Sequence, residues 1–299
     1  MTNNPRILMC SPDYYGIEYE INPWMNTRVN ADPARSLTQW RALVRILEDL
    51  GATIERLEPV PRLPDLVFTA NAGIVYHNLF LSSRFRFEVR QGETPCFDRR
   101  FVELGFLVET LPEGMFFEGA GDALFCGETL FAGYRFRSDA LSQQWIGERL
   151  GVETLPLELV DPRYYHLDTC FCPLSSDQAI YYPGAFDDYG RSVLAARVDR
   201  LIEVHADEAV SFSCNAVVVG RTVILNDVSP RLKRDLEANG YAVRATPLSE
   251  FIKAGGSAKC LTFRIDGEDA ASWKREPIRR LPPRPSDPRK IDLHSPPES

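Results

Sequence analysis

Four segments of the chain share one pattern of apolar and polar residues. Each opens with Asp or Asn and a small residue, and continues as an apolar run, a polar turn and a second apolar run, which is typical of a β-hairpin. The segments are NAGIVYHNLFL from Asn71, DALFCGETLFA from Asp122, DTCFCPLSSDQAIYY from Asp168, and NAVVVGRTVIL from Asn215. These openings recur at intervals of roughly 45 to 50 residues. Cys260 stands one interval further on, before another strand-like run.

Helical stretches, each followed by Gly and a short strand, separate the hairpins. The stretches are WRALVRILEDLGATIERL, RRFVELGFLVETLP, SQQWIGERLGVETLPL and RLKRDLEANGYAVRATPL, with VLAARVDRLIEV in the same role but without the glycine. Gly51, Gly105, Gly151 and Gly240 stand where helix C-caps favour glycine. The pattern predicts an α/β fold of five repeated ββαβ units, and about five units favour a ring over an open stack. In a ring, the polar openings would face one central cavity.

Both ends of the chain lie outside the repeat. The N-terminal part has a first strand and then a loop whose residues 22–25, NPWM, serve as a flexible cover or as a closing strand. Residues 271–299 are rich in proline and charge, which predicts a disordered tail after a catalytic domain of residues 1–270. The PPRP motif in this tail could also dock a partner as a polyproline II helix.

Composition narrows the class of protein. With 34 basic and 42 acidic residues, the net charge of -8 argues against a nucleic-acid partner. No apolar run has the roughly 18 residues needed to span a bilayer, and no signal peptide is evident, so we expect a cytoplasmic protein. The 7 cysteines are an odd number without paired spacing, which favours reduced thiols. Because Cys170 and Cys172 form a single CxC motif, we expect neither a metal site nor a cofactor.

Three groups of residues compete for the central cavity. FEGAGDAL places Glu118 and Asp122 on a glycine-rich turn that a ligand can approach closely. YHLDTCF places His166 and Asp168 two residues apart, so that on a strand both would point to the same side. Cys260 adds a thiol after a glycine pair. The structural alternatives are that Asp and Asn open strands as turn residues and that the cysteine packs as a small apolar side chain.

The combination of a thiol, an imidazole and several carboxylates favours a cationic substrate. A Cys beside a His can ionise below its usual pKa, and the His can move protons. Surrounding acids oppose that ionisation unless the substrate brings a positive charge. A planar guanidinium fits because its N–H donors bond carboxylates in pairs.

FEGAGD, HLD and a late Cys after a GG turn resemble the guanidine-modifying superfamily, over roughly residues 5 to 266. That group includes arginine deiminases, dimethylarginine hydrolases and arginine:glycine amidinotransferases. The resemblance implies a five-bladed α/β propeller with Cys260 as the nucleophile and His166 as the acid and base. It further implies that Glu118 and Asp168 grip the guanidinium group, and that Asp122 belongs to the substrate site.

The resemblance also implies that Arg90 and Arg137 hold the substrate carboxylate, the alternative being two surface arginines. Deiminases have an Asp where this chain has Asn71, and a neutral amide could hold a ureido group. With Asn22 in NPWM, this residue makes the chain similar to the cyanobacterial-type arginine dihydrolases, which yield ornithine, ammonia and carbon dioxide.

Other activities and classes stay open from the sequence alone. An enzyme of this kind could stop at citrulline, take methylated arginines, or transfer the amidino group to an amine. A propeller without catalysis could act as a sensor that binds arginine, and the tail could act as a scaffold. Oligomeric state, including a homo-oligomer, is also open.

Overall fold

The computed structural model describes residues 4–275 and 281–289, and its strands form five sheets of three strands each. Four sheets follow the chain order. Their strands are β3 Gly73–Tyr76, β4 Leu79–Ser82 and β5 Leu107–Thr110; β6 Ala123–Cys126, β7 Thr129–Tyr134 and β8 Thr154–Glu158; β9 Phe171–Pro173, β10 Gln178–Tyr181 and β11 Arg200–Glu203; β12 Val217–Val219, β13 Thr222–Leu225 and β14 Ala242–Ala245.

Each of these sheets is the ββαβ unit that the sequence predicts. The first two strands form an antiparallel hairpin, as between β3 and β4, and the third pairs in parallel with the second. The parallel strand follows a helix because a parallel partner requires a crossover connection. The α/β fold and its repeated units are therefore confirmed.

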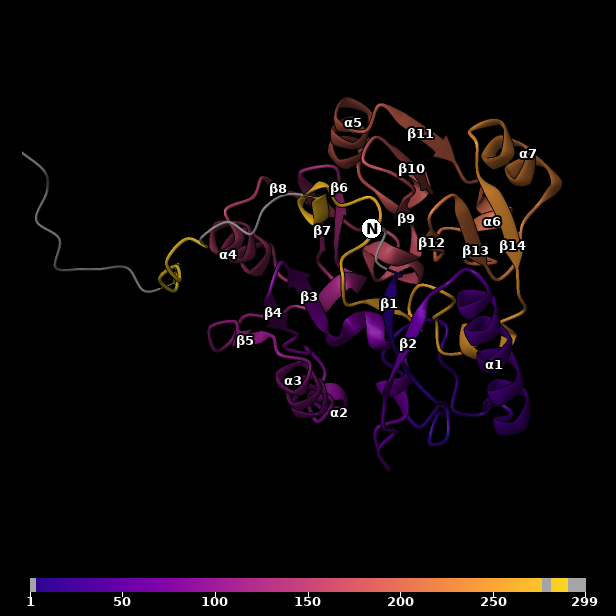
Figure 1. Cartoon of the computed structure of the whole chain (residues 1–299), viewed down its shortest axis with the longest axis horizontal. Helices are drawn as coiled ribbons and strands as arrows, with labels where there is room; N and C mark the ends of the chain where they lie inside the picture. The colour runs from indigo at the N-terminus through magenta and orange to yellow at the C-terminus, as the bar shows by residue number, and fades with distance from the viewer. Residues whose placement is uncertain (1–3, 276–280, 290–299) are drawn as a thin grey trace, which may run out of the picture.

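The remaining sheet joins residues from both ends of the described chain. Its strands are β1 Arg6–Cys10, β2 Thr53–Leu57 and β15 Phe263–Arg264. β1 pairs in parallel with β2 and antiparallel with β15, so that Ile7 lies opposite Arg264. Figure 1 shows the five sheets following one another around the middle of the molecule, with the longer helices outside them.

The longer helices occupy the predicted positions. They are α1 Pro33–Asp49, α3 Thr94–Glu103, α4 Ala140–Leu150, α5 Asp188–Arg197 and α7 Pro230–Ala238, and the one-turn helices are α2 Glu88–Gln91, α6 Ala206–Ala209 and α8 Ser249–Ile252. Asp32 caps α1 through a bond from the Arg35 N–H group. Gly151, at the end of α4, has a φ of 68°, which glycine adopts without strain.

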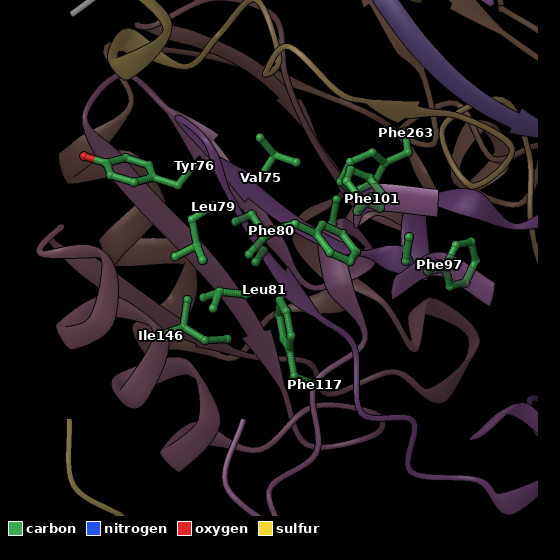
Figure 2. Close-up of a cluster of buried hydrophobic side chains, with 14 of the residues drawn as sticks. Val75, Tyr76, Leu79, Phe80, Leu81, Phe97, Phe101, Phe117, Ile146 and Phe263 are labelled. Atoms are coloured by element: carbon green, nitrogen blue, oxygen red, sulfur yellow. The ribbon is translucent and has the colours of Figure 1, made fainter. Parts of the chain in front are cut away.

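Aromatic packing joins the first and last parts of the chain (Figure 2). The ring of Phe80 on β4 stacks on Phe101 of α3, with centroids 3.6 Å apart. Phe263 on β15 lies edge-on to both rings. Since all three side chains are buried, truncating one to alanine would cost about 3–5 kcal/mol.

The N-terminal loop outside the repeat is fully described by the structure, whereas the C-terminal tail is described only in part. Residues 22–25 form a loop without a strand, so a closing strand at NPWM was wrong. Of the tail predicted to be disordered, residues 271–299, residues 276–280 and 290–299 lie outside the described residues. Within the described part, Trp145 and Arg149 of α4 donate hydrogen bonds to the carbonyls of Pro285 and Pro282.

Candidate active site

The polar openings of the repeated units lie on tight turns just before the first strand of each hairpin. Three of these turns are the 3₁₀ helices η2 Thr69–Ala72, η3 Gly119–Gly121 and η5 Leu167–Thr169. His166 and Asp168 therefore sit at and within a helical turn, and placing them on a strand was wrong. Short polar residues at these positions favour turns over regular strands.

Hydrogen bonds run from each opening to the next. The Asn71 amide donates to the carbonyl of Glu118, and Asp122 accepts from the N–H of Leu167. Asn215 donates to the carbonyl of Asp168. The fourth and fifth openings are joined because the Cys260 N–H donates to Asn215 Oδ1, and the fifth bonds the first because the N–H of Ala70 donates to the Cys260 carbonyl.

The thiol of Cys260 lies between two polar side chains from other units. Its Sγ is 3.4 Å from Oδ2 of Asp168 and 3.1 Å from Nδ2 of Asn215. Cys260 is 3% exposed and both partners are fully buried. Asp168 Oδ1 has no hydrogen-bond partner among the described residues. A buried carboxylate oxygen without a partner is an acceptor available to a ligand.

Burial opposes ionisation of both members of this pair, Cys260 and Asp168. Burial raises the pKa of Cys260 well above its usual value, and the Asp168 carboxylate raises it further. Burial also raises the pKa of Asp168 to about 7, although Lys259 and the hydrogen bonds from Cys260 and Asn215 act in the opposite direction. A positive charge placed beside both groups would lower both pKa values.

His166 belongs to a second buried cluster. Its Nε2 is 2.9 Å from Oε2 of Glu118, and Nη1 of Arg137 donates to the same oxygen at 2.8 Å. Burial alone would raise the pKa of Glu118, but the Arg137 charge and the His166 hydrogen bond hold it well below its usual range. Glu118 is therefore a carboxylate that orients the imidazole and keeps a negative charge beside it.

The expected contact between the thiol and the imidazole is not a direct one. Among the described hydrogen bonds, none joins Cys260 to His166. The sulfur of Cys260 bonds Asn215 and Asp168, whereas the imidazole of His166 bonds Glu118. The two clusters meet at one turn, because Asp168, which contacts Cys260, lies on the turn that begins at His166.

Arg90 and Arg137 are both buried, which excludes the alternative of two surface arginines. Arg90 forms two hydrogen bonds of 2.8 Å with Glu93 and one of 3.1 Å with Oδ1 of Asn71. Burial raises the pKa of Glu93 to about 7, against the opposing charge of Arg90. This arginine thus fixes the carbonyl side of the Asn71 amide.

Two further predicted residues are held by the protein itself. Asp122 accepts hydrogen bonds from the Ser138 hydroxyl and from the backbone N–H of Leu167, so both oxygens have partners. Burial raises its pKa to about 6. Asn22 is half-buried, and its Nδ2 donates to the carbonyl of Ala254 at 3.0 Å. This bond joins the NPWM loop to the segment that precedes Cys260.

The glycines of FEGAGD serve close packing within the protein. Gly119 has a φ of 64°, and a Cβ there would lie 2.7 Å from the backbone nitrogen of Gly73. At Gly121, a side chain would collide with the amide of Asn71. The sequence predicted that this turn leaves room for a ligand. In the structure, its glycines instead allow tight contact between two of the openings.

Asp65 is a buried residue of this region that the sequence patterns did not single out. It lies on η1 Pro64–Val67, and its Oδ2 is 3.7 Å from Nε of Arg90. Its Oδ1 has no partner among the described residues, and burial raises its pKa. A single Asp after a proline looks like an ordinary turn residue, so only an acidic residue within an apolar run, PDLVF, could have marked it.

Within residues 4–275 and 281–289, no group of three or more His, Cys, Asp or Glu side chains is placed to hold a metal ion. None of the helices in the same part of the chain is long and apolar enough to cross a bilayer.

A family model and similar known proteins place this chain in the same family. Residues 18–266 match the family described as N,N dimethylarginine dimethylhydrolase, eukaryotic. The chain is 47% identical over 270 residues to the bifunctional arginine dihydrolase/ornithine cyclodeaminase ArgZ of Synechocystis sp., covering 89% of this chain and 38% of that protein. It is 36% identical to the dimethylarginine dimethylaminohydrolase of Mycobacterium tuberculosis, covering 87% of this chain and 85% of that enzyme.

A solved structure agrees with the computed fold. The N-terminal domain of cyanobacterial ArgZ, in a mutant form bound to its substrate, superposes with a TM-score of 0.86 at 46% identity. The match covers 90% of this chain and 100% of that domain. This chain thus spans the length of that domain but only 38% of the full bifunctional ArgZ.

Proposed function

Because this chain belongs to the N,N-dimethylarginine dimethylhydrolase family, we propose that it hydrolyses the guanidinium group of L-arginine twice, as an arginine dihydrolase. The observation that carries this proposal is the buried thiol of Cys260 beside Asp168, whose Oδ1 has no partner among the described residues. The likeness to ArgZ, which is named an arginine dihydrolase, supports the choice of substrate.

The first hydrolysis begins when the guanidinium group binds beside Asp168. Its N–H groups donate to the carboxylate, and its charge lowers the pKa of the Cys260 thiol. The thiolate attacks the guanidinium carbon, and ammonia leaves with a proton from His166. Water, deprotonated by His166, then attacks the S-alkylthiouronium, and the C–S bond breaks to give citrulline and the free thiolate.

The second hydrolysis requires that the neutral ureido group stays in the site. Asn71 presents an amide whose Oδ1 is held by Arg90, and an amide exerts no charge preference for a cation. A second attack by Cys260 releases the second ammonia, and water frees the carbamate, which loses carbon dioxide. Arginine and two waters thus become ornithine, two ammonia and carbon dioxide.

The other predicted residues support this chemistry in distinct ways. Glu118 orients His166 through the 2.9 Å hydrogen bond, so we assign it to positioning the acid and base. Asp122 holds the turn of His166 through the N–H of Leu167. Arg137 and Arg90, which are paired with Glu118 and Glu93, are assigned to attracting the substrate carboxylate. Asn22 joins the NPWM loop to the segment before Cys260.

The same proposal includes a closed five-bladed α/β propeller. The hydrogen bonds that pass from each opening to the next, and from Cys260 back to Ala70, support it. The pairing of β15 with β1 supports it too, because one sheet then contains both ends of the repeat. Catalysis without a cofactor or a metal, in the cytoplasm, remains part of the prediction.

Product analysis tests the activity. We expect ornithine and ammonia in a ratio of one to two from arginine, measured by mass spectrometry and an ammonia assay. The Cys260→Ser variant should lose turnover while still binding arginine in calorimetry. A matched control is Cys126→Ser. Cys126 is also buried, but its thiol donates to the carbonyl of Ser175, which is not a residue of the proposed site. Turnover retained by Cys260→Ser would overturn the mechanism, whereas arginine binding without turnover by the wild type would favour a sensor.

Dimethylarginine hydrolysis is the second candidate, favoured by the family match and by the enzyme of Mycobacterium tuberculosis. It uses the same thiol and releases dimethylamine in place of ammonia. Turnover of dimethylarginine without turnover of arginine would select it, and citrulline as the final product from arginine would select a deiminase.

A further inference from the structure

Asn215 opens one of the repeated units, but it has no role in the proposed mechanism of arginine hydrolysis. It is fully buried, and its Nδ2 lies 3.1 Å from the sulfur of Cys260. Its position in the repeat is equivalent to those of Asn71, Asp122 and Asp168.

The orientation of the amide is fixed by its other contacts. Oδ1 accepts hydrogen bonds from the backbone N–H groups of Ser257, at 3.0 Å, and Cys260, at 3.2 Å. An oxygen that accepts from two N–H groups cannot be exchanged with the nitrogen, because the nitrogen would then face two donors. The N–H side must therefore point at the sulfur and at the Asp168 carbonyl, 3.1 Å away.

We propose that Asn215 is a hydrogen-bond donor to the Cys260 sulfur that stabilises the thiolate each time it forms or leaves. An N–H group bonded to an anion stabilises the charged form over the neutral form. The inference rests on the proposed function for the reaction steps in which the thiolate acts. The contact itself stands on the structure alone.

The surroundings of the sulfur mostly oppose its negative charge. The titratable groups that face the sulfur are Asp168, at 3.4 Å on η5, and Tyr165. The pKa of Tyr165 is itself raised, mainly by burial. The charge of Lys259 lowers the pKa of Asp168. Burial and the Asp168 carboxylate both oppose the thiolate. Two groups favour the negative charge, the backbone N–H of Ser257 and the amide of Asn215, and Asn215 is the only side chain of the two.

The mechanism gains a defined step from this contact. When the tetrahedral adduct collapses, the C–S bond breaks and its electron pair goes to the Cys260 sulfur. The Asn215 N–H already points at that sulfur, so no reorganisation is required as the charge develops. Because Oδ1 also holds the two N–H groups of the cysteine segment, the donor and the sulfur move as one unit.

Alkylation of the thiol tests the proposal without requiring turnover of arginine. The second-order rate of Cys260 labelling by iodoacetamide is measured from pH 7 to pH 9, by mass spectrometry of the peptide that contains it. Only the thiolate reacts, so the rate below the pKa reports the pKa directly. For Asn215→Ala we expect the rate curve to move by about one pH unit to the alkaline side, a roughly tenfold lower rate at each pH.

A purely structural role predicts the opposite sign. If Asn215 only clamped the segment of Ser257 and Cys260, its loss would loosen the segment and expose the thiol, and labelling would become faster. Labelling of Asn215→Ala at or above the wild-type rate therefore overturns the proposal. Asn226→Ala is the matched control, because Asn226 also accepts a backbone N–H, from Leu248, and donates to the Ser211 carbonyl. We expect it to leave the labelling rate unchanged.

A second variant keeps the test valid if Asn215→Ala does not fold. Asn215→Asp retains an oxygen for the N–H groups of Ser257 and Cys260 but replaces the donor by an acceptor. We expect a larger alkaline shift than one unit, and an unshifted curve overturns the proposal. If arginine is turned over, kcat should fall about tenfold in Asn215→Ala with little change in KM. If the wild type does not act on arginine but Asn215→Ala is still labelled more slowly than the wild type, this inference is supported and the proposed function is refuted.

Discussion

Replacing Glu118 by Gln removes one negative charge from a site where Arg137 and His166 both bond to it. The carboxylate accepts from Arg137 at 2.8 Å and from His166 at 2.9 Å, and it is fully buried. Gln has the same shape, and with its oxygen at the place of Oε2 it can still bond both partners, but it carries no charge and its NH₂ group would face the Arg86 N–H. Breaking a buried pair of this kind costs about 3–5 kcal/mol, because the Arg137 charge stays buried without its partner.

The free energy of unfolding, from urea denaturation at pH 7, gives the magnitude directly. The pH dependence adds a second measurement. Since the folded pKa of Glu118 is depressed, its stabilisation is complete above the unfolded pKa of about 4.3 and is lost as pH falls below that value. The difference in stability between wild type and Glu118→Gln should therefore narrow below pH 4. Loss of the orientation of His166 should lower kcat by about 100-fold or more.

Glu55→Gln is the matched control for this experiment. Glu55 also bonds two arginines, Arg6 at 2.7 Å and Arg100 at 2.9 Å, but all three side chains are partly exposed. Its replacement should cost under about 1 kcal/mol and leave kcat unchanged. If Glu118→Gln loses no more stability and no more activity than Glu55→Gln, the assignment of Glu118 to the His166 cluster is refuted.

Three further predictions follow from the same contacts. Asn71→Asp should raise the fraction of citrulline among the products, because a carboxylate prefers the cationic guanidinium to the neutral ureido group; an unchanged ornithine yield, by mass spectrometry, argues against this role. Asp168→Asn should abolish turnover but raise the melting temperature at pH 8, because the carboxylate with a pKa of about 7 is costly to ionise when buried; a lower melting temperature at that pH contradicts it. A chain truncated after Arg275 should keep its kcat and lose only a few degrees of melting temperature, as contacts of Trp145 with the tail are lost; a loss of activity would favour a functional tail.

Local patterns in the sequence were sufficient for the repeated units. The hairpin at Asn71 has two apolar runs around the polar pair His77 and Asn78, and β3 ends and β4 begins at that turn. Gly105 and Gly240 lie just after helices in the structure and have positive φ, as expected of helix ends. Such features depend only on neighbours in the chain, which is why one sequence reveals them.

Contacts between distant segments could not be predicted in the same way. β15 has only two residues, and its pairing with β1 joins Phe263 to Leu8 across almost the whole chain. A strand this short has no alternation to detect. Its partner is set by how the five units pack, which depends on the whole structure.

The chemistry of the site was predicted in kind but not in its connections. The residue types of Cys260, His166 and Asp168 indicate a nucleophile, a proton carrier and a carboxylate. Which carboxylate contacts which group depends on the 3₁₀ turns, and short polar turns have no periodicity that fixes side-chain direction. The same reason hid the contact of Asn215 with the sulfur and the burial of Asp65.

The central claim is that the sulfur of Cys260 becomes covalently bonded to the guanidinium carbon of arginine. Rapid acid quenching of enzyme mixed with arginine, followed by mass spectrometry of the peptides, tests this bond directly. We predict a Cys260 peptide heavier by arginine less ammonia, absent in Cys260→Ser and present in Cys126→Ser. Steady turnover of arginine with an unmodified Cys260 at every quench time would contradict the account.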